Sequence, residues 1–423
     1  MSISMIRKTD NGQRPFIPYA RQWIDEEDIA AVVEVLRSDW LTTGPKIAEF
    51  EEAVAQFVGA KYAVAVNSGT AALHAAMYAI DIGPGDEVIL PPMTFVATAN
   101  AVVFQGGTPV FADVNPDTLL IDPNEVESKI TPRTKAIVAV DYAGQPCDYD
   151  SLQAIARKHG LILIADACHA LGAEYKGKRV GTLADLTVFS FHPVKHITTG
   201  EGGMITTDDA ELAERMRLFR HHGITRDPKR FSPLTSPPAS PERAGSRWRA
   251  GDLRPLTSDF SWYYEMLDMG YNYRLTDFQC ALGISQLPKL PEFLRRRKAI
   301  AHCYDNAFVS MPEVSPLAVR KEVSHAYHLY VTKLKVEQLN ADRGQIFSSM
   351  RAEGIGVNVH YIPVHLHPYY RRCFNTKPGD CPVAERAYEY IISLPIFPAM
   401  SQKNIDDAIT ATTKVMQHFR YGG

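Results

Sequence analysis

The sequence predicts an α/β fold with a mostly parallel central sheet flanked by helices, followed by a smaller C-terminal α+β domain. Two observations lead to this prediction. Short, continuously apolar runs recur between residues 62 and 206, and segments of helical length separate them. Strands that are apolar on both faces and alternate with helices are typical of a parallel sheet covered on both sides. Because ligands of such sheets bind at the carboxyl ends of the strands, we expect the chemistry there.

Two helices are predicted before the first strand. Residues 24–38 have Asp25 as a candidate cap, acidic residues in the first turn and apolar residues at helical spacing. Pro45 suits the first position of a second helix over residues 45–58, and Gly59 suits its end. The strands predicted next are 63–66, 87–90, 109–113, 136–140, 161–165, 186–191 and 203–206. The helices predicted among them are 70–80, 94–104, 149–159 and 209–221.

The pattern changes after this alternating region. Residues 225–261 are rich in proline and serine and poor in periodic apolar residues, which predicts a flexible surface insertion. A helix is then predicted from Leu275 to Leu287 and beyond. We therefore expect a large domain over residues 1–285, with an N-terminal arm and the insertion, and a smaller domain over residues 286–423.

The composition excludes several classes of protein. The 423 residues include 45 Lys+Arg and 48 Asp+Glu, and the net charge of -3 argues against a nucleic-acid binder. No apolar run is long enough to predict a membrane span. The six cysteines form no CxxC pair, which favours reduced thiols in a cytoplasmic protein. No metal site is predicted, because Pro193 separates His192 from His196 and no HExxH motif occurs.

The first stretch with chemical content is Asn67-Ser68-Gly69-Thr70-Ala71-Ala72, between a predicted strand and a predicted helix. The first turn of a helix presents unpaired N–H groups and a partial positive charge, which suits a phosphate. Gly69 permits close approach of the backbone, and Thr70 adds a hydroxyl. A plain N-cap explains this hexapeptide equally well when it is taken alone.

The second stretch, Ile164-Ala165-Asp166-Ala167-Cys168-His169-Ala170, places a carboxylate at the end of a strongly apolar strand. A charge buried there needs a partner, because burying an isolated charge is costly. A protonated ring nitrogen of a ligand is one suitable partner for Asp166. The alternative is that Asp166 caps a helix and His169 is an ordinary core histidine.

The third stretch runs from Phe189 to Gly203 and contains Lys195 between a strand end and a glycine-rich turn. A lysine low in a cleft loses water, which lowers its pKa and leaves the neutral amine that forms a Schiff base with an aldehyde. Ser190 supplies a hydroxyl near the same strand end. Most lysines are solvated surface groups, so Lys195 is informative only together with the other two stretches.

A phosphate cradle, a buried acid and a strand-end lysine together match the requirements of pyridoxal 5′-phosphate. Their order resembles that of the fold-type I sugar aminotransferases of the DegT/DnrJ/EryC1/StrS family, and the resemblance extends from about Pro18 to Pro398. The stretches that carry it are 17–22, 39–45, 190–203, 270–277 and 357–365.

The resemblance implies a role for several residues of the cofactor site. Lys195 would form the Schiff base and move the proton between the cofactor and C4 of the sugar. Asp166 would keep the pyridine nitrogen protonated, so that the ring acts as an electron sink. His169 would lie near the phenolic oxygen, and Phe95 would stack on the ring, although Phe95 also suits an ordinary core position.

The resemblance also implies which residues bind the phosphate. These are Gly69, Thr70, Ser190 and, from the other subunit of a homodimer, Asn272. Two positions depart from the family pattern: Ala165 stands where a second acid is common, and Cys168 stands where a small aliphatic residue is expected. Neither change removes a catalytic group.

The implied activity is transfer of an amino group from L-glutamate to C4 of a UDP-4-keto-6-deoxy-N-acetylhexosamine, as in pseudaminic acid biosynthesis. The alternatives are transamination at C3, or of a dTDP- or GDP-linked keto sugar. Lys195 argues against the family's sugar dehydratases, in which we expect a histidine at that position. A non-catalytic regulator of the same fold would show an eroded site or an attached DNA-binding domain, and the sequence has neither feature.

Overall fold

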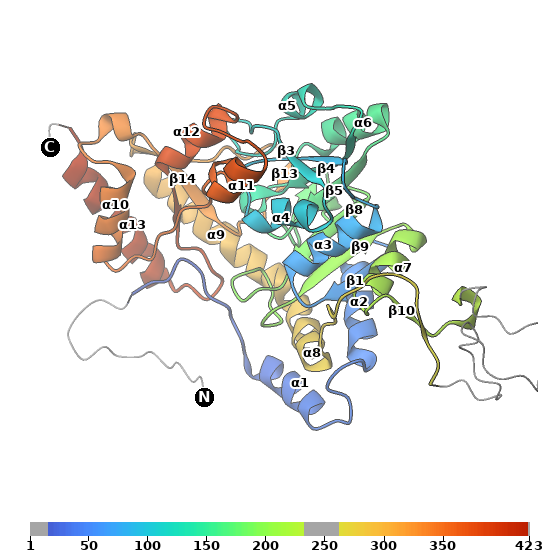
Figure 1. Ribbon diagram of the computed structural model, residues 1–423. Helices are drawn as coiled ribbons and strands as arrows, with labels where there is room; N and C mark the ends of the chain where they lie inside the picture. The colour runs from blue at the N-terminus through green and yellow to red at the C-terminus, as the bar shows by residue number, and fades with distance from the viewer. Residues whose placement is uncertain (1–15, 232–261, 422–423) are drawn as a thin grey trace, which may run out of the picture.

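The computed structural model describes residues 16–231 and 262–421. The strands of its central sheet are β1 (Tyr62–Val66), β2 (Glu87–Leu90), β3 (Thr108–Phe111), β4 (Thr134–Val140), β5 (Ile162–Asp166), β8 (Leu186–Ser190) and β9 (Gly203–Thr207). They are ordered β1-β9-β8-β5-β4-β2-β3, and β9 is antiparallel to both of its neighbours (Figure 1). The contacts among β8, β5, β4, β2 and β3 are parallel. The predicted mostly parallel sheet is therefore confirmed.

The helices that accompany this sheet are α1 (Glu26–Leu36), α2 (Pro45–Val58), α3 (Gly69–Ala79), α4 (Val96–Phe104), α5 (Pro123–Ser128), α6 (Tyr149–His159), α7 (Ala210–Phe219) and α8 (Asp277–Gln286). Helix α1 begins and helix α2 ends at the residues that the sequence signals predict. Asp25 caps α1 in a capping box with Asp28, and Gly59 ends α2 in the left-handed conformation with a φ of 84°. Local sequence therefore determines where these two helices begin or end.

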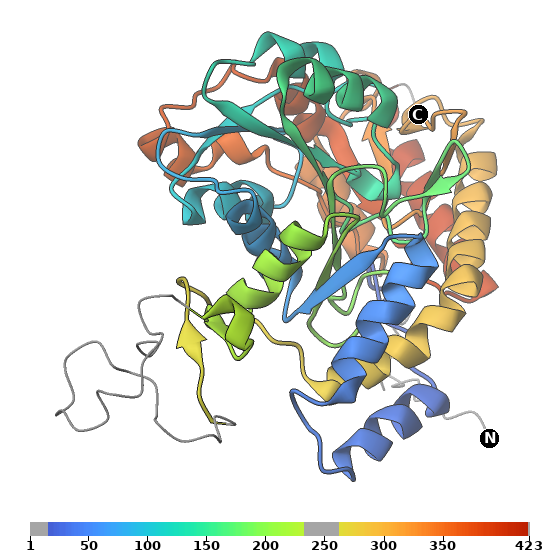
Figure 2. The same cartoon turned by 90° about the vertical axis from the view of Figure 1, so that its right-hand side faces the viewer.

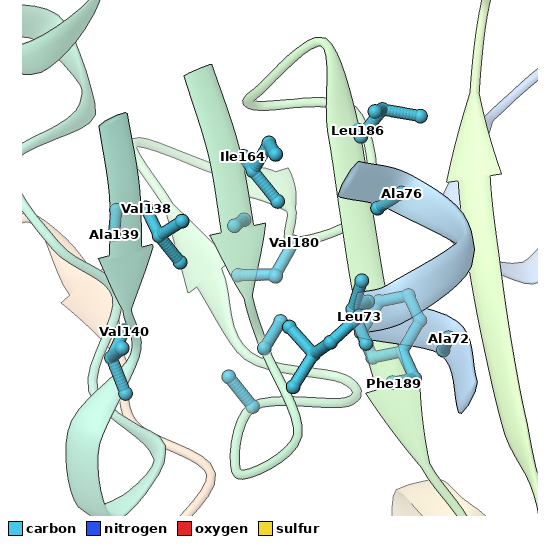
Figure 3. Close-up of a cluster of buried hydrophobic side chains, with 14 of the residues drawn as sticks. Ala72, Leu73, Ala76, Val138, Ala139, Val140, Ile164, Val180, Leu186 and Phe189 are labelled. Carbon is cyan, nitrogen blue, oxygen red and sulfur yellow. The ribbon is translucent and has the colours of Figure 1, made fainter. Parts of the chain in front are cut away.

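Helices cover both faces of the sheet. Helix α3 packs against α4 and α7, whereas α5 packs against α6, and α6 contacts β5. Right-handed crossovers place these two groups on opposite faces, because β1 to β2 and β4 to β5 run in opposite directions across the sheet. Figure 3 shows Leu73 and Ala76 of α3 facing the side chains of the strands. The small residues of α3 allow this close approach, and nearly all of its side chains are buried.

The C-terminal part contains a second, smaller sheet and several further helices. Its elements are α9 (Leu290–Phe308), β12 (Val314–Pro316), β14 (Tyr330–Leu334), α10 (Arg343–Ala352), α11 (Pro368–Cys373), α12 (Pro382–Tyr390), β15 (Ile391–Leu394) and α13 (Gln402–Phe419). The strands form an antiparallel sheet in the order β12-β14-β15. Figure 1 shows α10 and α13 at the end of the molecule remote from α7.

Helix α9 joins the two hydrophobic cores. Leu290, Phe293 and Leu294 at its start belong to the core of the large sheet. Ile300 and Tyr304, further along, belong to a separate core among the C-terminal elements. Figure 2 shows this long helix running along one side of the molecule. The boundary predicted at residues 285 and 286 falls at the end of α8, just before this helix, and it stays a prediction.

Short strands complete the fold. Strands β6 (Glu174–Tyr175), β7 (Lys178–Arg179) and β13 (Val323–Ser324) form one small sheet, and β10 (Ile224–Thr225) pairs with β11 (Glu265–Met266). The β10–β11 pair brings together the two ends of the predicted insertion. Residues 232–261 of that insertion lie outside the described residues.

Candidate active site

A cavity of about 540 Å³ opens at the carboxyl ends of the strands. Residues that follow β1, β2, β5 and β8 line it, as the topology of a parallel sheet requires. They include every predicted site residue except Asn272: Gly69, Thr70, Phe95, Asp166, His169, Ser190 and Lys195. The sheet therefore brings together residues that are up to 126 positions apart, counted from Gly69 to Lys195.

The N-terminus of α3 forms one wall of the cavity. Ser68 caps the helix by accepting a hydrogen bond from the backbone N–H of Ala71 at 3.1 Å. The N–H groups of Gly69 and Thr70 lie in the first turn, where a helix offers no carbonyl partner. A Cβ atom on Gly69 would lie 3.0 Å from the Cβ of Ser190 at the end of β8. The absence of a side chain at Gly69 thus keeps the cradle open.

Asp166 is the last residue of β5, and its carboxylate is buried beneath the cavity. Its Oδ2 accepts a hydrogen bond from the Thr98 hydroxyl at 2.7 Å. Its Oδ1 accepts a longer bond of 3.3 Å from the backbone N–H of Cys168. A carboxylate that lines a cavity with two neutral donors retains capacity to bind a protonated nitrogen.

Lys195 reaches the same cavity from the loop between β8 and β9. Desolvation lowers the pKa of its amine, although the nearby Cys168 and Asp166 side chains oppose this effect. A lowered pKa increases the fraction of neutral amine, which is the nucleophilic form. The location of Lys195 therefore suits attack on an aldehyde.

Two aromatic residues, Phe95 and Tyr361, form another part of the cavity wall. Phe95, at the N-cap of α4, exposes 58% of its surface although it is a large apolar residue, because it faces the cavity. Its ring centroid lies 6.2 Å from that of Tyr361, whose hydroxyl lies 3.2 Å from Nε2 of His169. Nδ1 of His169 is buried and has no hydrogen-bond partner among the described residues. This wall offers a flat apolar surface and one unused polar atom.

Sequence reasoning did not assign roles to several other residues of the cavity. His328 lies against His169, with 4.3 Å between the ring centroids, and His360 also lines the cavity. Burial lowers the pKa of His360 to about 3 and lowers that of His328 well below its usual value. Thr98 was missed because one threonine in a predicted helix gives no signal. The stretch 357–365 was noted only as part of the resemblance, without a role for Tyr361.

Asn272 is not among the residues that line this cavity. It is exposed and pairs with His221 in an isolated β-bridge, and its carbonyl oxygen accepts a hydrogen bond from the Asn67 side chain at 3.4 Å. An exposed position is compatible with contact to a second subunit. The predicted role of Asn272 in a neighbouring site stays a prediction.

The residues around the cavity fit pyridoxal phosphate. Unpaired N–H groups at a helix start suit a phosphate, and the buried Asp166 suits a ring nitrogen. The exposed ring of Phe95 suits an aromatic face, and Nδ1 of His169 has no other partner in the described part of the chain. The volume of the cavity lies within the range of small-molecule sites.

Comparison with known proteins agrees with this geometry. A sequence profile of the DegT/DnrJ/EryC1/StrS aminotransferase family matches residues 22–413. The chain belongs to this family. It is a sugar aminotransferase whose cofactor is pyridoxal phosphate, as the motifs predicted.

Relatives of this aminotransferase are similar over almost their whole length. The spore coat polysaccharide biosynthesis protein SpsC of Bacillus subtilis is 43% identical over 403 residues, which cover 95% of this chain and 97% of that protein. PseC of Helicobacter pylori, an aminotransferase involved in the biosynthesis of pseudoaminic acid, is 36% identical. Its structure matches with a TM-score of 0.83 over 96% of this chain and all of that chain.

A third relative is a putative sugar aminotransferase, Spr1654, of Streptococcus pneumoniae. Its PLP-form is 32% identical and matches with a TM-score of 0.83 over 95% of this chain and 99% of that chain. A PMP-form of the same protein also matches.

The described part of the aminotransferase has neither a metal-ligand cluster nor a membrane-spanning helix. Within residues 16–231 and 262–421, no group of three or more His, Cys, Asp or Glu side chains is arranged to hold a metal ion. In the same ranges, no helix has the length and apolar character needed to cross a membrane.

Proposed function

We propose that this aminotransferase transfers an amino group from L-glutamate to C4 of UDP-2-acetamido-2,6-dideoxy-β-L-arabino-hex-4-ulose. The observation that carries the chemistry is the meeting of Lys195, Asp166 and the start of α3 in one cavity. The likeness to PseC over 96% of this chain supports a 4-keto sugar on the route to pseudaminic acid. Bound pyridoxal phosphate supplies an electron sink and carries the amino group between the two substrates.

The side chains have separable binding tasks in this proposal. The N–H groups of Gly69 and Thr70, with the Ser190 hydroxyl, bind the phosphate because they converge on one side of the cavity. The Phe95 ring covers one face of the cofactor and excludes water from it. Nδ1 of His169 donates a hydrogen bond to the phenolic oxygen if Nε2 accepts one from Tyr361.

Asp166 and Lys195 hold or transfer protons in this proposal. Asp166 holds a proton on the pyridine nitrogen, because a buried carboxylate stabilises a nearby cation. Lys195 Nζ accepts a proton from Cα of glutamate in the first half-reaction and delivers one to C4 of the sugar in the second. The lowered pKa of Lys195 favours the neutral amine, which is the form that accepts the proton.

A homodimer with shared sites is part of the proposal. Asn272 is exposed, and its backbone is tied to the loop that follows β1 through Asn67. In the proposed dimer, Asn272 of each subunit contacts the phosphate bound at the start of helix α3 in the other subunit. The cytoplasmic location is likewise a proposal, resting on six cysteines that are all free.

A second candidate acceptor is another nucleotide-linked keto sugar. The 43% identity to the spore coat polysaccharide protein of Bacillus subtilis favours it, because that relative serves polysaccharide synthesis. Both acceptors require the same amino transfer. The two acceptors differ in the sugar and the nucleotide, and so each requires a differently shaped pocket in the protein.

The decisive experiment incubates purified protein with glutamate and a panel of UDP-, dTDP- and GDP-linked keto sugars. Mass spectrometry and NMR of the product identify the nucleotide and the carbon that is aminated. We expect product only with the UDP-linked 4-keto-6-deoxy-N-acetylhexosamine. Product from another member of the panel would replace the proposed acceptor. If glutamate gives no product with any of the keto sugars, glutamate is not the donor.

The proposed lysine is tested independently of turnover. Borohydride reduction of the yellow holoenzyme followed by peptide mapping should label Lys195, and Lys195→Ala should lose the absorption band. Lys298→Ala is a matched control, because the Lys298 amine donates to Ser324 rather than facing the cavity. A label on another lysine would overturn the assignment.

A further inference from the structure

Two threonine hydroxyls form a directed chain that ends on the Asp166 carboxylate. Thr98 Oγ1 lies 2.7 Å from Asp166 Oδ2, and Thr94 Oγ1 lies 2.8 Å from Thr98 Oγ1. The ionised carboxylate only accepts, so the Thr98 proton points to Asp166 and the Thr94 hydroxyl must donate to Thr98. All three side chains are buried and line the cavity.

The Thr98 bond is the shorter of two hydrogen bonds that the side-chain oxygens of Asp166 accept. The other donor, the backbone N–H of Cys168, is 3.3 Å from Oδ1. Oδ2 is thus held by the shorter of these bonds, whereas Oδ1 accepts the longer one. A carboxylate fixed through one oxygen keeps the other oriented and available.

Thr98 also connects the carboxylate to the aromatic wall. It lies in the first turn of α4, and its backbone N–H donates to the carbonyl oxygen of Phe95 at 3.2 Å. The same turn therefore positions the ring of Phe95 and the hydroxyl that contacts Asp166. The first turn of α4 thus links these two parts of the cavity wall.

We propose that Thr98, oriented by Thr94, is the positioning residue that aims Asp166 at the pyridine nitrogen of the cofactor. This inference rests on the proposed role of Asp166. In this proposal Thr98 acts through the Asp166 carboxylate, to which its hydroxyl donates. Loss of its hydroxyl would leave Oδ2 without its donor and let the carboxylate rotate away from the ring.

The test compares Thr98→Val, which removes the hydroxyl at nearly constant volume, with Thr98→Ser, which keeps it. The dissociation constant of pyridoxal phosphate is measured by titrating apoenzyme. NMR of ¹⁵N-labelled cofactor gives the pH at which the ring nitrogen loses its proton. For Thr98→Val we expect about tenfold weaker binding and a titration at least about one pH unit lower. The dissociation constant of Thr98→Ser should stay within about twofold of that of the wild type. The dissociation constant of Thr94→Val should lie between those of Thr98→Ser and Thr98→Val.

Thr412→Val is the matched control for loss of a buried threonine hydroxyl. Thr412 donates to the carbonyl oxygen of Ala408 at 2.8 Å within α13 and does not line the cavity. Thr412→Val should leave unchanged both the dissociation constant of pyridoxal phosphate and the pH at which the ring nitrogen loses its proton. If Thr98→Val does not fold, Thr94→Val carries the test, because it leaves the Thr98 side chain in place.

The proposal is wrong if the hydroxyl-free variants bind the cofactor and titrate like the wild type. It is also wrong if Thr98→Ser is as impaired as Thr98→Val, since that result would assign the effect to packing. Neither result would affect the assignment of Lys195 or of the substrate. Those are tested by borohydride labelling and by the product of the wild-type enzyme.

Discussion

Close approach between a strand end and a helix start explains the glycine at position 69. The nearest atoms to a Cβ built there are Ser190 Cβ at 3.0 Å and Ser190 Oγ at 3.2 Å. Both belong to a residue proposed to bind the phosphate. An added methyl group would press on the hydroxyl that the ligand needs, whereas the glycine leaves it free to turn.

Gly69→Ala should therefore weaken cofactor binding more than it weakens the fold. We expect about tenfold weaker binding of pyridoxal phosphate, measured by titrating apoenzyme, with a change in unfolding free energy of about 1 kcal/mol or less. Gly83→Ala is the control, because a Cβ there meets nothing nearer than Asp86 Oδ2 at 4.0 Å. Equal binding by the two variants would contradict the proposed cradle.

The start of helix α3 combines a structural and a ligand-binding task. Ser68 satisfies the N–H of Ala71, and the preceding N–H groups are left for an anion. Helix α7 begins in a similar way, with Asp209 accepting from the N–H groups of Glu211 and Leu212, but it does not line the cavity. The two helix starts thus permit a matched comparison.

Ser68→Ala and Asp209→Ala should each lower the unfolding free energy by about 1 kcal/mol, as loss of an N-cap usually does. Only Ser68→Ala should also weaken pyridoxal phosphate binding, because the first turn of α3 would lose its alignment. Chemical denaturation measures the first effect, and apoenzyme titration measures the second. An equal loss of cofactor affinity in Asp209→Ala would show that the effect is not local to α3.

The whole molecule contains several buried neutral histidines. Burial lowers the pKa of His325 to about 3, with a contribution from Lys298, and that of His74 to about 4. An unfolded histidine binds a proton near pH 6.5, so below that pH the unfolded state takes up more protons than the folded state. The stability supplied by these groups is present above about pH 6.5 and is lost as the pH falls toward 4 and 3.

We predict that His325→Asn reduces the acid sensitivity of the fold. Asparagine can still accept the hydrogen bond that Nδ1 receives from the N–H of Tyr327 at 2.8 Å. The loss of unfolding free energy between pH 7 and pH 5 should shrink by up to about 2 kcal/mol, measured by denaturant titration at each pH. His302→Asn is the control, because His302 is exposed, and it should leave this pH dependence unchanged. An unchanged slope in His325→Asn would contradict the prediction.

The proposed homodimer is tested by mixing two inactive variants. Lys195→Ala and Asn272→Asp chains should each be inactive, because one lacks the amine and the other adds a carboxylate that repels phosphate. Mixed dimers contain one site with both native residues, so activity should return to about a quarter of the wild-type level after complete subunit exchange. No recovery with exchange confirmed by mass spectrometry would show that the two residues act in the same site.

Local sequence signals were sufficient for much of the fold and for the identity of the central groups. Pro45 and Gly59 mark the ends of α2 because their backbone preferences act within one turn, and the apolar runs predicted every strand of the central sheet. Asp166 and Lys195 were found because Asp166 ends one apolar strand and Lys195 lies in the loop that follows another. Their catalytic roles came from the resemblance to a family, and these roles stay predictions.

Only the tertiary structure decided which side chains surround those groups. Thr98 and Asp166 are 68 positions apart, and His169 and Tyr361 are 192 apart. Contacts over such separations depend on strand order and on the packing of α4 and the C-terminal part, for which no local pattern carries information. The sequence by itself determined where the strands of the central sheet lie, and it predicted the chemistry of the cavity. The fold determined how the Asp166 carboxylate is held, because a hydrogen bond between distant residues forms only once their elements have packed.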